Sequence, residues 1–229
     1  MKNVDFYKLL TAELDTIVAE RMEGKLRAKL KQEEQKRAYA LLIWFLSFYS
    51  EVANVETYIT DGNDDASCDI ILDLTDSQGE KTFYLIQSKW NSEANCSGEL
   101  DSTELKSFLS DVQVVMRGEK SGSKNSRFNA RYKELLQHTK RNGAVKAIFL
   151  CLKNRCTTTA DNLTSTKNSI GGRLDIEVFD INRIKCDSYR GDSRVRSHPT
   201  PSIASTALST KRSDYVSQGM IPRPATRFL

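Results

Sequence analysis

The chain has 229 residues, of which 39% are hydrophobic and 28% are charged, proportions typical of a globular protein with one apolar core. Its two histidines are too few for histidine-centred nuclease chemistry or for Ser-His-Asp hydrolysis. It contains neither a Walker-type phosphate loop nor a dinucleotide-binding glycine motif, so no nucleotide cofactor is expected. The absence of a signal peptide and of a bilayer-spanning apolar run predicts a cytoplasmic protein without membrane contact.

The net charge of +4 comes from the C-terminal end. Residues 187–229 hold seven Lys or Arg against three Asp, with many Ser, Thr and Pro and few apolar residues. This composition predicts a disordered basic tail. In residues 1–186 the charges balance, so a nucleic-acid surface there has to be a local patch. The five cysteines form no C-x-x-C pair, which indicates reduced thiols in a cytosol.

Helices are predicted at the N-terminal end. Residues 5–32, in an N-terminal helical segment 1–34, have apolar residues at three- and four-residue steps. This stripe could pack on the core, which is the simpler interpretation, or pair with a second copy in a homodimer. A second helix is predicted at 35–52, where the broad apolar face is typical of a helix lying on a sheet. Residues 54–60 are then predicted to form the first strand.

The rest of the pattern predicts an α/β fold. Residues 68–74 and 81–90 read as two strands joined by a tight turn, and therefore as an antiparallel hairpin. A crossover through helices would add the later strands in parallel. The result is a central mixed β-sheet flanked by helices. The later elements are predicted at 102–116 (helix), 128–139 (helix), 144–152 (strand), 157–169 (helix) and 174–179 (strand).

Three polar side chains fall at one end of the predicted hairpin. Asp69 opens the first strand, while Gln87 and Lys89 lie on one face at the end of the second, because side chains alternate along a strand. A carboxylate and an amide oxygen can hold Mg²⁺, and an ammonium can stabilise charge that develops on a phosphate. The pattern suits metal-assisted hydrolysis of a phosphodiester. By spacing alone, an ordinary surface hairpin with a solvated Lys is the commoner explanation.

A family resemblance favours the nuclease interpretation. The segments ITDGNDDASCDII and YLIQSKW resemble the N-terminal region of the abortive-infection phage-resistance (AIPR) family. Their arrangement also resembles the PD-(D/E)XK nuclease superfamily, in the Mrr-like branch where Gln replaces the second acid. The resemblance covers about residues 38–184 and implies a restriction-endonuclease-like core over 35–186. Asp65 aligns with the first loop acid of the family, and Ala66-Ser67 stand where the family prefers two glycines, which reach positive φ freely.

The resemblance implies a DNA endonuclease of phage defence that needs Mg²⁺ or Mn²⁺. Asp69 and Gln87 would be metal ligands, and Lys89 would assist the attacking water or the transition state. Enzymes of this kind commonly cut as dimers. The alternative is a catalytically inactive nuclease fold that binds nucleic acid or a protein partner, which the missing glycine pair favours.

Other charged residues are weaker candidates. Glu34 could be a further metal-facing acid, although a solvated acid at a helix N-terminus is commoner. Asp73 shares the strand face of Asp69 and could support the site. A basic cluster suited to phosphate contact or to a solvated helix start follows the third predicted helix, with Lys120, Lys124, Arg127, Arg131 and Lys133.

Overall fold

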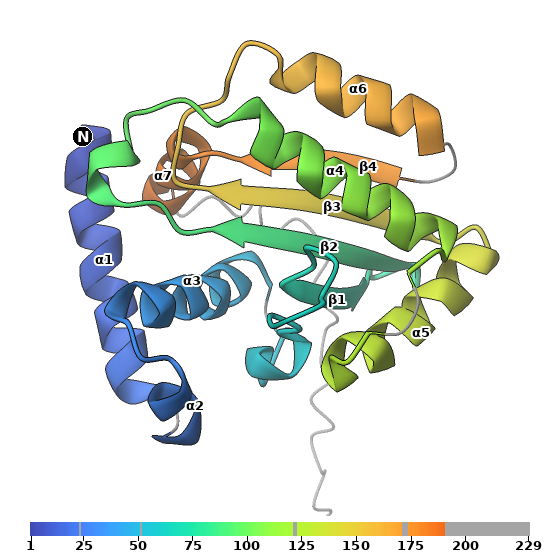
Figure 1. Ribbon diagram of the computed structural model, residues 1–229, viewed down its shortest axis with the longest axis horizontal. Coiled ribbons are helices and arrows are strands. Elements are labelled where there is room, and N and C mark those ends of the chain that lie inside the picture. Colours follow the sequence, from blue (N-terminus) through green and yellow to red (C-terminus); the bar gives the residue numbers. More distant parts are fainter. Residues whose placement is uncertain (23, 51, 121–122, 171–173, 191–229) are drawn as a thin grey trace, which may run out of the picture.

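A four-stranded mixed sheet in the order β1-β2-β3-β4 lies at the centre of the computed structural model (Figure 1). The structure describes residues 1–22, 24–50, 52–120, 123–170 and 174–190, so the predicted tail lies outside the described residues from position 191. β1 (Ile70–Thr75) and β2 (Lys81–Lys89) form an antiparallel hairpin. β3 (Ala144–Cys151) and β4 (Leu174–Phe179) continue the sheet in parallel. The predicted α/β class, hairpin and mixed sheet are confirmed.

Helices cover both faces of the sheet, which makes three layers (Figure 1). Side chains of the central strands alternate between two apolar clusters: Tyr84 and Ile86 belong to one, and Phe83 and Leu85 to the other. Because both faces are covered, β3 is apolar except for Lys146, and the middle of β2, Phe83 to Ile86, is apolar and buried. One layer consists of α1 (Asn3–Glu20), α3 (Glu33–Tyr49) and α7 (Ile181–Arg190), and the other of α4 (Ser102–Arg117), α5 (Ser126–Lys140) and α6 (Thr159–Ile170).

The predicted first strand at 54–60 is wrong. Its residues form a short 3-10 helix, η1 (Val55–Tyr58), and only Ile59 makes an isolated bridge, to Ile70. Asn54 adopts a left-handed conformation with φ 56°, and its carbonyl oxygen accepts hydrogen bonds from the backbone and side chain of Thr57. These local hydrogen bonds compete with a strand ladder.

The predicted helix at 5–32 is divided in two. α1 ends at Glu20, and a separate short helix, α2 (Gly24–Lys29), follows. The apolar stripe of α1 is buried against α3 of the same chain, and Leu9 is the only large apolar side chain of α1 that stays exposed. The stripe therefore serves the core, as in the simpler interpretation, and the homodimer stays a prediction. α7 was not predicted, and no described helix could cross a membrane.

We predict that Gly143→Ala destabilises the fold. A Cβ at this turn, which leads from α5 into β3, would overlap the ring of His138. The ring packs on Phe83 with centroids 5.0 Å apart and cannot withdraw freely. We expect a loss of about 1–3 kcal/mol in the free energy of unfolding, measured by urea denaturation.

Gly24→Ala is the matched control, because a Cβ there meets nothing within 4 Å. The substitution should leave stability unchanged or raise it slightly. In a double-mutant cycle, His138→Ala should absorb part of the cost of Gly143→Ala, since it removes the overlapping ring. Strictly additive costs would contradict the steric explanation.

Candidate active site

Three carboxylates converge in the loop before β1. Asp61, Asp65 and Asp69 each offer an oxygen within 4.8 Å of the other two. Backbone hydrogen bonds close this loop, because the nitrogens of Thr60 and Asp61 both donate to the Asp69 carbonyl, at 2.8 and 3.0 Å. The Asp65 carboxylate also accepts the backbone N–H of Ser67 at 3.0 Å. The loop thus brings its first and last acids side by side.

The turn within the loop uses left-handed backbone. Ala66 and Ser67 have φ of 52° and 55°, at the two positions where the resembled family prefers glycine. A Cβ in this conformation costs about 1–2 kcal/mol per residue. The hydroxyl of Ser67 donates to the Asp111 carboxylate on α4, and this contact helps to hold the turn. The structure therefore reaches a glycine-type turn without glycine.

A distant segment of the chain fixes the acidic loop in place. The Asp64 carboxylate accepts the backbone N–H of Lys124 at 3.1 Å, and the Asp64 carbonyl accepts the Ser123 hydroxyl at 2.8 Å. The Asn125 amide donates to the carbonyl of Thr60 at 2.7 Å. The segment before α5 therefore sets the position of the loop, although it lies some 60 residues away in the sequence.

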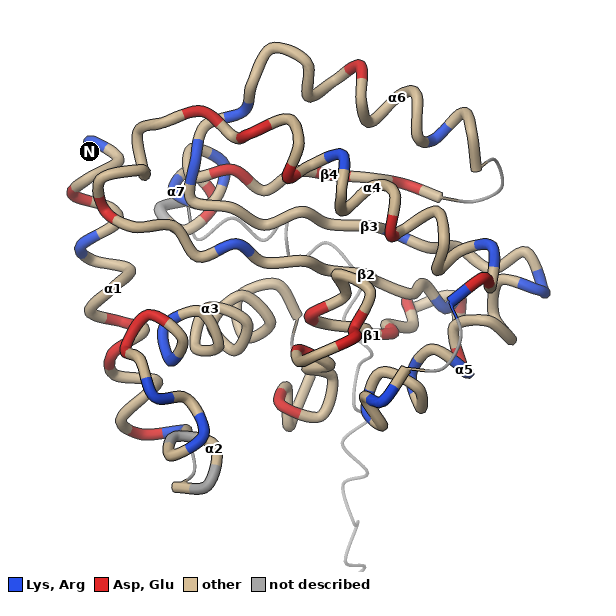
Figure 2. Tube along the Cα trace, viewed as in Figure 1, with Lys and Arg blue, Asp and Glu red and all other residues tan. Residues whose placement is uncertain are grey.

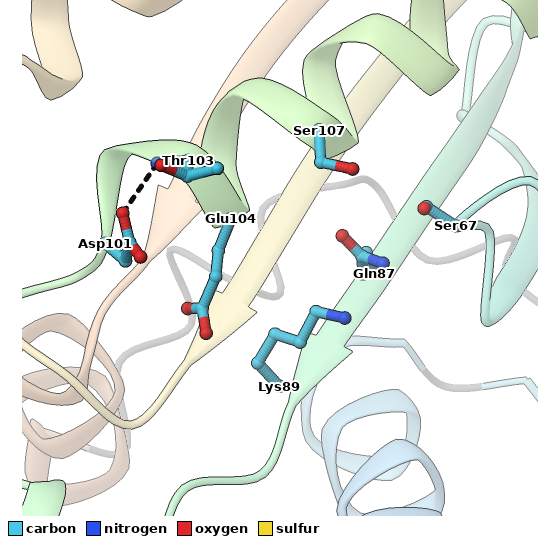
Figure 3. Close-up of a pocket in the computed structure, with 7 residues that line it drawn as sticks. All are labelled: Ser67, Gln87, Lys89, Asp101, Thr103, Glu104 and Ser107. Carbon is cyan, nitrogen blue, oxygen red and sulfur yellow. Dashed lines mark hydrogen bonds between the residues drawn. The ribbon is translucent and has the colours of Figure 1, made fainter.

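β2 contributes Gln87 and Lys89 to a polar pocket of about 260 Å³ beside this loop (Figure 3). The ammonium end of Lys89 points toward Gln87, and Glu104 and Ser107 of α4 line the pocket with them. Gln87 is 6% exposed, whereas Lys89 is half-buried and forms no ion pair with a described residue. The full lining comprises Ser67, Gln87, Lys89, Asp101, Thr103, Glu104 and Ser107.

Asp69 lies next to this pocket but is not part of its lining. Its carboxylate accepts the backbone N–H of Ser88 at 2.6 Å, between the two pocket residues of β2. Burial raises the pKa of Asp69 to about 7, and repulsion by Asp61 and Asp65 adds to the rise. The hydrogen bond from Ser88 and the charge of Lys89 oppose it. Lys89 is therefore electrostatically coupled to Asp69.

The other two acids have raised pKa values for the same reasons. Burial raises the pKa of Asp61, and Asp65 adds repulsion, while Lys29 and Lys89 lower it. Burial also raises the pKa of Asp65, against hydrogen bonds from backbone N–H groups and the charge of Lys89. Within the described part of the chain, none of the three acids forms an ion pair at 4.0 Å or less. Their combined charge has no direct counter-ion among the described residues.

This donor set fits a hard divalent cation. Mg²⁺ prefers carboxylate oxygens and keeps several of its waters, so three converging acids at a partly open loop suit it. Mutual repulsion among carboxylates raises their pKa, and a bound cation would relieve that repulsion. Among the described His, Cys, Asp and Glu side chains, Asp61, Asp65 and Asp69 form a group that could hold such an ion.

The two weaker candidates for the metal site, Glu34 and Asp73, interact with other residues. The Glu34 carboxylate accepts the indole N–H of Trp90, and it is not among the converging acids. Asp73 pairs with Lys81 at 2.7 Å and with Arg131. These pairs tie the hairpin to α5 and account for Asp73 without a role in the metal site.

The basic cluster is partly neutralised inside the protein. Lys120 pairs with Asp64, and Arg131 pairs with Glu134 at 2.6 Å as well as with Asp73. The other three cations of the predicted cluster (Lys124, Arg127 and Lys133) are exposed. Only part of the cluster is therefore available to a phosphate.

Sequence reasoning did not single out two residues of this region. Asp61 is the third converging acid, and the acid-rich stretch 61–65 contained the signal for it. Glu104 faces Lys89 across the pocket, but no sequence spacing links α4 to β2. Its Oε2 atom is buried without a hydrogen bond, and its nearest cation is Lys153 at 3.6 Å.

Comparisons of the chain with protein-family models, with curated proteins and with solved structures found no match.

We predict that Ala66→Gly relaxes the turn. Glycine removes the strain of the left-handed backbone but adds freedom to the unfolded chain, so the free energy of unfolding should stay unchanged or rise by up to about 1 kcal/mol. The control Ala130→Gly, on the exposed face of α5, should instead lose about 1 kcal/mol. Equal losses in urea denaturation would contradict the strain at position 66.

The raised pKa of Asp69 predicts that stability falls as the pH rises. An unfolded Asp titrates near pH 4, so between about pH 4 and about pH 7 the folded protein binds more protons than the unfolded chain. We expect a loss on the order of 2–4 kcal/mol across this window, measured by urea denaturation. Asp69→Asn should remove most of the slope.

Two controls belong to this experiment. Asp161→Asn, at an exposed position of α6, should keep the wild-type slope. Millimolar Mg²⁺ should stabilise the wild-type protein above about pH 7 and stabilise Asp69→Asn less, because a cation bound only to the folded state shifts the equilibrium. If the free energy of unfolding depends on pH in the same way in the wild-type protein and in Asp69→Asn, the raised pKa of Asp69 is refuted.

Proposed function

We propose that this chain is a divalent-metal-dependent nuclease that hydrolyses phosphodiester bonds of DNA. The observation that carries the proposal is the convergence of Asp61, Asp65 and Asp69, which lack a counter-ion among the described residues, beside the unpaired ammonium of Lys89. Asp65 and Asp69 are partly buried and Asp61 is exposed. Perturbed and crowded carboxylates cluster at functional sites.

The chemistry assigns a role to each side chain. The three carboxylates would hold Mg²⁺ or Mn²⁺, which polarises the phosphate and activates water when bound. Lys89 would stabilise the negative charge that develops on the phosphate oxygens, because it is near the acids but not neutralised by an ion pair. Gln87 would orient water or a phosphate oxygen through its amide, and it is named here as a further metal ligand on the strength of the resemblance.

Hydrolysis requires one bond to form and one to break. The oxygen of water attacks phosphorus and gives up a proton to solvent. The bond from phosphorus to the leaving sugar oxygen breaks, and that oxygen takes up a proton from solvent. The polar pocket that Gln87 and Lys89 line supplies room for water. The resemblance to the AIPR family extends the proposal to a DNA endonuclease in phage defence.

A nuclease-like fold that only binds is the second candidate. The observation in its favour is that Asp69 lies outside the lining of the pocket that contains Gln87 and Lys89, and that its carboxylate is hydrogen-bonded to Ser88. A binding module would use the same loop to contact nucleic acid or a protein partner without turnover.

We predict that purified protein nicks plasmid DNA with Mg²⁺ or Mn²⁺ and not in EDTA. Asp69→Asn should lower the rate of nicking at least about 100-fold, because it removes a metal ligand. Lys89→Ala should lower it by a similar factor, because the negative charge of the transition state is no longer stabilised. Gel electrophoresis of supercoiled plasmid measures the rate.

The controls are Asp161→Asn and Lys106→Ala, which change an exposed acid on α6 and an exposed cation on α4 outside the site. Both should retain the wild-type rate. Cleavage that survives Asp69→Asn would come from a contaminant or another site and would overturn the proposal. No cleavage by the wild-type protein with either metal, with DNA binding retained, would favour the binding module.

A further inference from the structure

Unpaired cations lie beside the acidic loop on the side of α5. Lys124 and Arg127 are exposed, and neither forms an ion pair with a described residue. Their neighbours Lys120 and Arg131 differ, because each is paired with an acid of the protein. The Arg127 guanidinium does donate a hydrogen bond to the Tyr39 hydroxyl, but no described acid neutralises either cation, so both charges are available to an external anion.

Hydrogen bonds hold these cations against the loop. Asn125 caps α5 by accepting the N–H of Phe128 at 3.1 Å, and its amide nitrogen donates to the carbonyl of Thr60. The first turn of α5, which carries Arg127, is therefore anchored to the residue that precedes Asp61. The backbone nitrogen of Lys124 is anchored in the same way, to the Asp64 carboxylate.

A third cation approaches the loop from α2. Lys29, the last residue of this helix, is exposed and unpaired among the described residues, and its charge acts on Asp61. Figure 2 shows the basic residues of α2 and of α5 on opposite sides of the acidic segment that leads into β1. The acids thus lie between two groups of positive charge.

This charge pattern suits a chain of phosphates. An acidic cluster alone repels a polyanion, so binding of a nucleic acid across it requires cations on its rim. Cations in direct contact with the acids would be neutralised by them. Lys29 acts on Asp61 without an ion pair, and Lys124 and Arg127 lie in the segment that is hydrogen-bonded to the acidic loop. Exposed Lys and Arg at such positions contact backbone phosphates and set the path of a strand.

We propose that Lys29 on one side, and Lys124 and Arg127 on the other, bind phosphates of a nucleic-acid strand that crosses the acidic loop from α2 to α5. These phosphates flank a central phosphate, which lies at the three acids. The inference rests on the proposed function for the central phosphate only. The three cations make up the phosphate clamp.

The clamp predicts the salt dependence of binding. Binding of a fluorescein-labelled duplex, and of one of its single strands, is measured by anisotropy in EDTA between about 50 and 200 mM salt. Lys29→Ala, Lys124→Ala and Arg127→Ala should each lower the slope of log K against log salt by about 0.9 on duplex or about 0.7 on single strand. The triple variant should bind at least about tenfold more weakly at physiological salt. The polymer with the larger loss is the one that occupies the clamp.

Lys140→Ala is the matched control, because Lys140 is exposed in the last turn of the same helix, far from the capped end. It should keep both the affinity and the salt slope of the wild-type protein. Thermal unfolding of each variant checks that the fold is retained. Clamp variants that behave like Lys140→Ala on both polymers would overturn the proposal.

Failure of the clamp and failure of the nuclease proposal are distinguishable. If the wild-type protein cuts plasmid and the clamp variants bind normally, the clamp proposal is wrong and the nuclease proposal stands. If the wild-type protein does not cut and the clamp variants bind weakly, the nuclease proposal is wrong and the clamp is a nucleic-acid-binding surface.

Discussion

Crowding of three carboxylates in one loop is the constraint on which the rest of this site depends. Asp61, Asp65 and Asp69 approach one another without a direct counter-ion among the described residues. Burial raises the pKa of all three, and repulsion by neighbouring acids adds to the rise at Asp61 and Asp69. A fold retains such a cluster only if other interactions hold the loop. A divalent cation would convert the repulsion into binding energy.

Those other interactions come from distant parts of the chain. The segment before α5 contributes Asn125 and the backbone of Lys124, and α4 contributes Asp111, which accepts the Ser67 hydroxyl. The left-handed residues of the turn persist because their surroundings specify them, as is common for strained backbone at functional sites. The helices on this face of the sheet therefore position the acids as well as form the core.

The sheet brings the acids and the cation of the site together. β1 and β2 are antiparallel, so the loop before β1 meets the end of β2, and Ser88 donates its N–H to Asp69 between Gln87 and Lys89. A local charge pattern follows, with acids in the middle and unpaired cations around them. Because the body of the chain has balanced charge, such a pattern is the means by which it could attract a polyanion.

Local sequence determined the hairpin, the main helices, the class of fold and the candidates Asp69, Gln87 and Lys89. Alternating and helical periodicities depend on near neighbours, so they are readable without a structure.

The tertiary structure decided the rest. Residues 54–60 coil because hydrogen bonds to Asn54 outcompete a strand ladder, and the stripe of α1 is buried by α3. Asp61 joins the acids, and Glu104 faces Lys89, only because backbone turns and helix packing bring them there, and no periodicity of the sequence encodes contacts between such separated residues.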